Sequence, residues 1–292
     1  MTFSIVACDE RHIGVATASH WVAAGALVPW AEPGAGAVAT QAFTDPAYGP
    51  DGLARMRAGA HPAEALAALA ARDPRRDLRQ VIMLDPHGRT AAMTGPGCFT
   101  ERASVTAAGV AAAGNMLGND AVPRAMIDAL NDTAGSLPAR LVAALRAGQR
   151  AGGDARGRQA AALRVVHRHH RPGDGHGVVA DLRVDDHRDP IAELSRLLRL
   201  HDRGARLTSA AFPSETPALT TGDPDRLRSA IKALRAIAGE PGDPDPEAAL
   251  WLALCHLRAG DPTAAEDALA GCPHLWPLVQ RWDHDLRSRT TA

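Results

Sequence analysis

Thr2 is the residue whose type and position offer the most specific chemistry. Methionine aminopeptidases generally remove Met1 when the second residue is small, so we expect Thr2 to become the first residue of the native protein. A free N-terminal threonine combines a nucleophilic hydroxyl with an α-amino group, whose ordinary pKa of about 7.7–8.0 suits a base near neutral pH. The position of Thr2 therefore indicates nucleophilic attack on a carbonyl group. The alternative is that Met-Thr is a start without catalytic meaning, as in many intracellular proteins.

Four polar residues near the ends of predicted strands are candidates to assist Thr2. Asn115 could donate its side-chain amide to an oxyanion, and Asp154 could hold the α-ammonium group of Thr2 or orient a neighbouring group. Ser19 and Gln41 could hydrogen-bond to Thr2 or to substrate. The structural alternatives are a turn or helix cap for Asn115, a surface Asp–Arg pair for Asp154, and satisfied internal groups for the other two.

Two histidine-containing segments suggest a metal site, at residues 167–176 and 185–187. Imidazole binds zinc well, but Arg168 and Arg171 stand among the histidines of the first segment and oppose a cation. The second segment leads into Asp189-Pro190, which is typical of a helix start. We therefore expect no metal. A metal-dependent hydrolase that uses the histidine loop is the weakest of three interpretations of function.

The secondary-structure elements expected from hydrophobic patterning occur in blocks along the chain. We expect strand pairs within residues 3–18, 79–94 and 158–184, further β segments at 36–41 and 104–113, and helices at 53–58, 62–71, 126–130, 137–148 and from 190. This order favours antiparallel sheets with helices outside over alternating βαβ units. No Gly-x-Gly-x-x-Gly opens a helix after a strand, and Lys232 is the only lysine, so we expect no nucleotide or other cofactor.

Eight segments, in order, resemble a bacterial family known as domain of unknown function 1028. They are TFSIVA (2–7), VATAS (15–19), VPWA (28–31), GAGAVATQA (34–42), YGPDGL (48–53), GNML (114–117), AGGDARGRQ (151–159) and DLRVDDH (181–187). The resemblance covers about residues 1–202. The family is placed in the N-terminal nucleophile (Ntn) hydrolase superfamily.

The resemblance implies an α+β fold, a four-layer αββα sandwich of two antiparallel sheets between helical layers. It also implies an amidohydrolase that cleaves an amide or peptide bond, with Thr2 as nucleophile. It identifies no substrate beyond a small amide or peptide. A competing interpretation is a catalytically silent Ntn-like scaffold whose helical tail binds a peptide or a cell-wall component, and retention of Met1 would favour it.

From about residue 203 the composition changes to helices that begin at Asp-Pro. The predicted helices at 225–238, 246–259 and 262–270 each carry an apolar stripe. We therefore divide the chain into an Ntn-like domain at 1–202 and a small helical domain at 203–292. The second domain has a tetratricopeptide-like hairpin and also resembles a helical domain labelled as peptidoglycan-binding. It contains none of the candidate site residues, so we expect it to be dispensable for the chemistry.

Composition restricts the partners and the compartment. A net charge of −1 offers no general attraction to nucleic acid or anionic lipid, and no apolar stretch is long enough for a membrane helix. Four cysteines without a Cys-x-x-Cys pair favour a reducing compartment, and the N-terminal residues do not resemble a signal peptide. We therefore expect a cytoplasmic protein that binds neither nucleic acid nor membrane. The sequence leaves open whether it forms a homo-oligomer.

Overall fold

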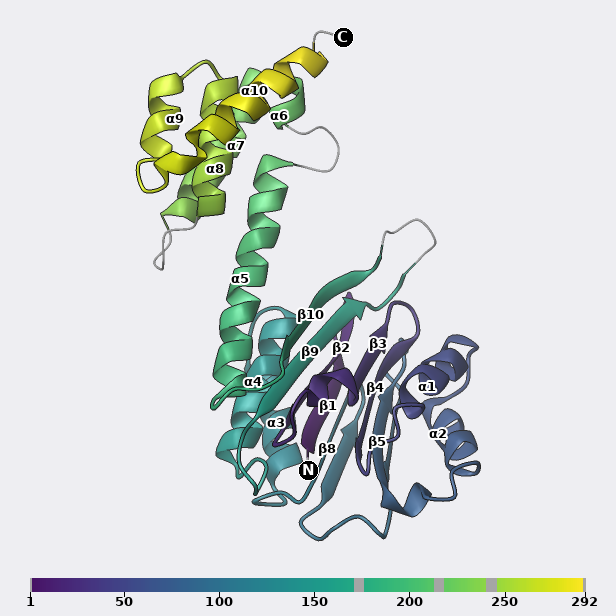
Figure 1. The fold of residues 1–292 in the computed structure, drawn as a ribbon. Helices are drawn as coiled ribbons and strands as arrows, with labels where there is room; N and C mark the ends of the chain where they lie inside the picture. The colour runs from purple at the N-terminus through teal and green to yellow at the C-terminus, as the bar shows by residue number, and fades with distance from the viewer. Residues whose placement is uncertain (1, 171–175, 213–217, 240–245, 291–292) are drawn as a thin grey trace. The chain divides into compact units, whose positions relative to one another are not determined.

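The structure, a computed structural model, describes residues 2–170, 176–212, 218–239 and 246–290 (Figure 1). The chain forms two compact units, Met1–Leu198 and Arg199–Ala292. It passes from the first unit to the second within helix α5 (Pro190–Ala211). The boundary expected at residue 202 from the change in composition therefore lies inside a continuous helix, where no break in the chain marks it.

The first unit contains two antiparallel sheets. Sheet A has the strand order β10-β9-β2-β1-β8-β7, and sheet B has the order β3-β4-β5-β6. The strands of sheet A are β1 (Thr2–Cys8), β2 (His12–Ser19), β7 (Ala103–Ala107), β8 (Val110–Asn115), β9 (Ala160–His167) and β10 (Val178–Val184). Those of sheet B are β3 (Pro29–Glu32), β4 (Gly36–Ala42), β5 (Arg79–Leu84) and β6 (Thr90–Thr94).

Alternation of side chains along the strands creates a core on each side of sheet A. In β1, Phe3 and Ile5 pack with apolar residues of α3 (Val122–Asp132) and α4 (Leu137–Arg150), whereas Val6 belongs to the core between the sheets. The inter-sheet core also receives Ile82 of β5 and Ala111 of β8. Because α3 and α4 cover one face of sheet A and sheet B covers the other, the β1 side chains from Thr2 to Ala7 are buried on both faces.

A third core covers the other face of sheet B. Val38 and Val81 pack there against α1 (Tyr48–Arg57) and α2 (Pro62–Ala70). Figure 1 shows these two helices beside β4 and β5, and shows α3 and α4 on the opposite side, beside sheet A. The first unit is thus a mixed α/β structure with two antiparallel sheets, and helices pack on one face of each.

Several elements differ from the sequence-based expectations. The single β segment expected at 104–113 is a hairpin of β7 and β8, in which Gly109 adopts a positive φ of 77° and turns the chain. Strand β3 was not expected, because it has only four residues, begins with a proline and gives almost no alternation. Helices α6 (Ala218–Thr221) and α10 (Trp276–Thr290) were also missed, because neither has the Asp-Pro start by which the other helices beyond α5 were predicted.

The second unit is helical and has a core of its own. Its helices beyond α5 are α6 (Ala218–Thr221), α7 (Pro224–Ala238), α8 (Pro246–Arg258), α9 (Pro262–Ala268) and α10. Leu234, Leu254 and Val279 are among its buried residues. The carboxylates of Asp223 and Asp261 accept backbone N–H bonds at the starts of α7 and α9, which explains the Asp-Pro signal. Among the described residues, no helix combines the length and apolarity that a membrane span requires.

A protein shortened to residues 1–200 should keep the fold of the first unit. It retains Ile191, Leu194 and Leu198, which belong to the core beneath α3 and α4. We expect cooperative thermal unfolding and a monodisperse sedimentation profile. As the control, a protein shortened to residues 1–187 loses all three side chains, each of which stabilises by roughly 1.5–3 kcal/mol when fully buried, and should aggregate. Aggregation of both proteins would show that the C-terminal helices complete the first core.

Candidate functional site

The space between the two sheets is apolar over most of its extent but polar at one end. Seven polar side chains from five strands meet there, all of them at most 6% exposed. They are Thr2, Ser4, Thr17, Ser19, Gln41, Gln80 and Asn115. Burying polar groups stabilises a fold less than burying apolar ones unless every group finds a partner. Such a cluster therefore marks a place where the sequence departs from what folding alone favours.

Thr2 begins β1 at the centre of this polar end. It lies opposite Asn115 of β8 in the strand register, and its side chain is 6% exposed. Its hydroxyl oxygen lies 3.1 Å from the hydroxyl oxygen of Ser19, the last residue of β2. The sheet thus brings Thr2, Ser19 and Asn115 together. Met1, whose removal the sequence predicts, lies outside the described residues.

Side-chain amides connect the two sheets behind Thr2. Gln41 Nε2 of β4 donates to Gln80 Oε1 (2.8 Å) and lies 3.3 Å from the carbonyl oxygen of Thr2. Asn115 Nδ2 also donates to Gln80 Oε1 (2.9 Å). Gln80 Nε2 of β5 donates to the carbonyl oxygen of Gly114 (2.9 Å). This last bond turns the Gln80 nitrogen toward Gly114 and the Gln80 oxygen toward Gln41 and Asn115. Both of these neighbouring amides must therefore donate an N–H to Gln80 Oε1.

Gln80 is the site residue that the sequence analysis missed. It belongs to a strand that reads as apolar, RQVIML, and one polar residue in such a strand is a weak signal. The alternation of β5 could have shown it, because Ile82 and Leu84 face the inter-sheet core and Gln80 must face the same way. A glutamine at a core-facing position requires partners, and Gln41 and Asn115 provide them.

A pocket of about 440 Å³ opens at the polar end. Thr2, Ser19 and Asn115 contribute to its lining, and most of the remaining lining is apolar, including Leu27, Val28, Ala42, Cys98 and Met116. Gln41 and Gln80 do not line the pocket but support the residues that do. This volume lies in the range of sites for small molecules. A substrate that entered would meet the Thr2 hydroxyl at the polar side of the pocket.

Strained backbone surrounds this pocket. Four residues other than glycine have a positive φ in the described chain: Ala23 (54°), Ala42 (70°), Glu101 (53°) and Met116 (49°). Ala42 and Met116 line the pocket, and Ala23 precedes the lining residue Ala24. This conformation costs about 1 kcal/mol or more for each residue, and such residues gather at functional sites. In β4 and β8 it turns the chain sharply at the strand end, next to Gln41 and Asn115.

Asp154 lies near the site but bonds to other groups. Its carboxylate accepts the backbone N–H of His20 (2.8 Å) and that of Arg156 (2.9 Å), and the Arg156 guanidinium lies 3.3 Å away. His20 follows Ser19, so Asp154 fixes the chain where β2 ends. It is 4% exposed rather than a surface residue. Asp154 thus bonds to the residue that follows Ser19, and none of the hydrogen bonds described for its carboxylate reaches Thr2.

Cys98 is the one thiol among the described residues that line the pocket, and its surroundings do not activate it as a nucleophile. Its side chain is buried, and its S–H donates to the carbonyl oxygen of Arg79 (3.4 Å). Burial raises the pKa of the Cys98 thiol, and Arg102 offsets this only in part. A thiol held in its protonated form is a poor nucleophile. The hydroxyls of Thr2, Ser19 and Thr44 are therefore the nucleophile candidates in the described lining of this pocket.

The structure shows no metal centre in the described parts of the two histidine segments. In the parts of the chain that the structure describes, no three His, Cys, Asp or Glu side chains are grouped as a metal site requires. Residues 171–175 of the first segment lie outside those parts. In the second segment, His187 Nδ1 accepts the backbone N–H of Asp189 (3.0 Å), which is a turn at the start of α5.

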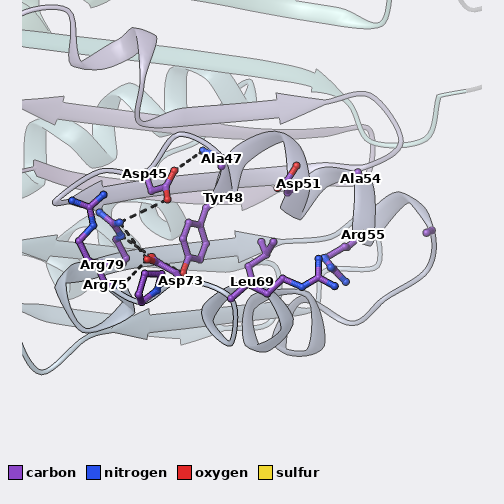
Figure 2. A pocket seen from close by; sticks show the side chains of 13 residues that line it. Asp45, Ala47, Tyr48, Asp51, Ala54, Arg55, Leu69, Asp73, Arg75 and Arg79 are labelled. Atoms are coloured by element: carbon purple, nitrogen blue, oxygen red, sulfur yellow. Dashed lines mark hydrogen bonds and ion pairs between the residues drawn. The ribbon is translucent and has the colours of Figure 1, made fainter.

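A second, open pocket lies beside α1 and α2 (Figure 2). It contains an ion pair that supports a wall of the Thr2 pocket. Arg79 Nε donates to Asp73 Oδ2 (2.7 Å), and both side chains are buried. Tyr48 donates its hydroxyl to the same carboxylate oxygen (3.2 Å), and burial together with Asp73 raises the pKa of Tyr48 to about 12. Arg79 Nη1 also donates to the carbonyl oxygen of Phe43 (2.5 Å). Because Phe43 lines the Thr2 pocket, this ion pair anchors one of its walls.

The comparisons with known proteins agree on one family. A family model described as "Family of unknown function (DUF1028)" matches residues 2–194. The chain is similar to the crystal structure of protein SPO2555 from Silicibacter pomeroyi, itself described as a DUF1028 protein. The sequence identity is 34% and the TM-score 0.61, and the match covers 68% of this chain and 88% of that one. A search of functionally curated proteins found no match.

Asp73→Asn should destabilise the protein near neutral pH and destabilise it less in acid. Arg79 lowers the pKa of Asp73 from its ordinary value of 3.8. The stability it contributes is therefore present above that value and is lost as the pH falls through the lowered pKa. We expect a loss of about 2 kcal/mol at pH 7, less than the roughly 3–5 kcal/mol for breaking a buried pair, because Asp45 stays 3.7 Å from Arg79.

Denaturant unfolding at pH 7 and pH 3 would measure this difference. The matched control is Asp128→Asn, which breaks the exposed Arg124–Asp128 pair (2.9 Å) and should cost at most about 0.5 kcal/mol. An equal loss for Asp73→Asn at both pH values would show that the carboxylate acts by packing and not by its charge.

Proposed function

The chain belongs to the DUF1028 family, and on that premise we propose that it is an N-terminal-nucleophile amidohydrolase that cleaves an amide or peptide bond with Thr2. The observation that carries the proposal is the place of Thr2. Its hydroxyl stands at the start of a buried central strand, beside Ser19, at the polar side of a pocket that a small molecule can enter. A hydroxyl in that place can meet a carbonyl carbon while the strand holds its backbone fixed.

The arrangement of layers supports the proposal. Helices α3 and α4, sheet A, sheet B, and helices α1 and α2 follow in the order that an Ntn-type αββα sandwich requires. In such a fold the nucleophile begins a strand and faces the space between the sheets. Thr2 begins β1, and Ser4, on the same face of β1, bonds to Gln41 of sheet B (2.6 Å). This placement of β1 supports Thr2 as the proposed nucleophile.

The proposed reaction has two steps and regenerates the protein. After Met1 is removed, the α-amino group of Thr2 accepts the hydroxyl proton as Oγ1 attacks the carbonyl carbon. The tetrahedral intermediate collapses, the C–N bond breaks, and the proton passes to the leaving nitrogen. This leaves an acyl ester on Thr2 and a free amine. A water molecule, deprotonated by the same α-amino group, then attacks the ester, releases the carboxylic acid and returns the proton to Oγ1.

Asn115 is the proposed oxyanion donor. Gln80 Oε1 takes one of its two amide protons, and this bond fixes the orientation of the Asn115 side chain. The second N–H is then left for a substrate oxygen in the pocket that Asn115 lines. A dipole fixed before the reaction begins needs no reorganisation as the negative charge develops. Ser19 and Asp154 act as positioning residues: Ser19 on the Thr2 hydroxyl, and Asp154 on the backbone that follows Ser19.

A β-lactone tests the proposal without knowledge of the substrate. This strained ester acylates a nucleophilic hydroxyl by ring opening, so the whole reagent adds to the protein. We expect intact mass spectrometry to find native protein that begins at Thr2, and peptide mapping to place the adduct on Thr2. Thr2→Ser should still react and Thr2→Ala should not. Quantitative retention of Met1, or a label that persists in Thr2→Ala, would exclude the mechanism and favour the silent scaffold with a ligand-binding tail.

Asn115→Ala should slow acylation of Thr2 by roughly 10²–10³-fold, the cost of losing one oxyanion donor. The rate of β-lactone labelling measures it, because that acylation also passes through a tetrahedral intermediate. Asn119→Ala is the matched control, since the exposed Asn119 amide caps the turn before α3 and is outside the pocket lining. A lowered unfolding temperature for Asn115→Ala with an unchanged labelling rate would assign Asn115 to the fold alone.

A further inference from the structure

Exposed apolar side chains concentrate around the Thr2 pocket. Six large hydrophobic residues are more than 40% exposed in the part of the chain that the structure describes. Four of them line this pocket: Trp21 (59%), Leu27 (42%), Phe43 (53%) and Phe99 (57%). Single exposed apolar residues are common on protein surfaces, but a contiguous group of them marks a binding surface. We call these four residues the apolar rim.

The backbone that carries the apolar rim is held in place. Phe43 follows the left-handed Ala42, and its carbonyl oxygen accepts from Arg79. The carbonyl oxygen of Phe99 accepts from Arg102 Nη1 (3.1 Å). The rings of Phe43 and Phe99 approach each other, with their centroids 6.4 Å apart. A rim that is fixed before a ligand arrives loses little conformational freedom when it binds one.

The charge of the pocket restricts the ligand further. Among the described residues that line it, Arg156 alone is charged, and its guanidinium lies 3.3 Å from the carboxylate of Asp154. The α-amino group of Thr2 acts as a base in the proposed mechanism and is neutral in that form. The pocket in its reactive form therefore has no surplus charge with which to attract an ionised group. A charged acyl group would lose its hydration without gaining a counter-ion, whereas an apolar group gains by leaving water.

We propose that the ligand of this pocket is an amide with an uncharged, apolar acyl group, an alkyl chain or an aryl ring, which packs against Phe43 and Phe99. This proposal takes the position of the scissile bond from the proposed function. The carbonyl carbon lies at the Thr2 hydroxyl, the polar side of the pocket, and the acyl group extends along the apolar walls toward the rim. A volume of about 440 Å³ accommodates such a group, and the amine that is released then faces solvent.

Binding without turnover tests the ligand class by itself. Acetamide, hexanamide and phenylacetamide are titrated by calorimetry into full-length Thr2→Ala protein, which cannot form the acyl ester. Each methylene that becomes fully buried tightens binding about fourfold, so hexanamide should bind at least about tenfold more tightly than acetamide. Adding Phe43→Ala or Phe99→Ala should weaken hexanamide binding about tenfold. Adding Leu200→Ala, which removes an exposed apolar residue outside the pocket, should not change it.

Hydrolysis of p-nitroanilides separates this inference from the proposed function. Acetyl, hexanoyl and succinyl anilides share one leaving group, so rate differences report on the acyl group alone. Faster cleavage of the hexanoyl compound, reduced in Phe99→Ala, supports both proposals. Apolar binding preference without any cleavage supports the ligand class and contradicts the hydrolase. A preference for the acetyl or succinyl compound would overturn the inference and leave the hydrolase standing.

Sedimentation tests the remaining explanation of the apolar rim, which is an interface with a second copy of the chain. If the wild-type protein sediments as a dimer and Phe43→Ala or Phe99→Ala sediments as a monomer, the rim is covered by a second copy of the chain. The inference about the acyl group is then wrong. An unchanged sedimentation coefficient in both variants, together with weaker hexanamide binding, supports it.

Discussion

The bonds among the Gln41, Gln80 and Asn115 amides are the constraint on which the site depends. Elsewhere the two sheets meet through alanine, valine, leucine and isoleucine, which can slide without losing a specific partner. At the polar end, Gln80 Oε1 accepts from one amide of each sheet, so the sheets cannot shift without leaving a buried polar group unpaired. An unpaired buried donor or acceptor costs about 1–3 kcal/mol. The network therefore fixes the position of β1 relative to sheet B, and with it the position of Thr2.

This constraint explains the order of the parts around the pocket. The strands are antiparallel, so the start of β1, the end of β2 and the end of β8 reach the same edge of sheet A. The end of β4 and the start of β5 reach the matching edge of sheet B. Beyond these ends the chain must turn away, and it does so at Ala42 and Met116 with left-handed backbone. Those turns carry the chain into the pocket wall, where Phe43 becomes part of the rim.

The sequence predicted much of the fold because its signals are local. The β1–β2 hairpin shows two short apolar runs around a polar turn, and the Asp-Pro starts of α7 and α9 are caps that the structure displays. Thr2, Ser19, Gln41 and Asn115 could be singled out because they lie at strand ends in the sequence. The contacts between them could not be predicted, because the pairing of β1 with β8 joins residues more than a hundred positions apart. The roles assigned to these residues stay predictions.

Three features around the pocket each reduce the stability of the folded protein. Replacing hydrogen-bonded amides by apolar groups of similar shape is often neutral or stabilising, and left-handed alanine and methionine store strain. Four large apolar side chains stay 42–59% exposed and therefore gain less from folding than buried side chains do. Chance would scatter such costs over a surface of this size. They converge instead on one pocket that contains the Thr2 hydroxyl. Selection for folding alone would remove them one by one, so their coincidence argues for a ligand whose binding depends on all three.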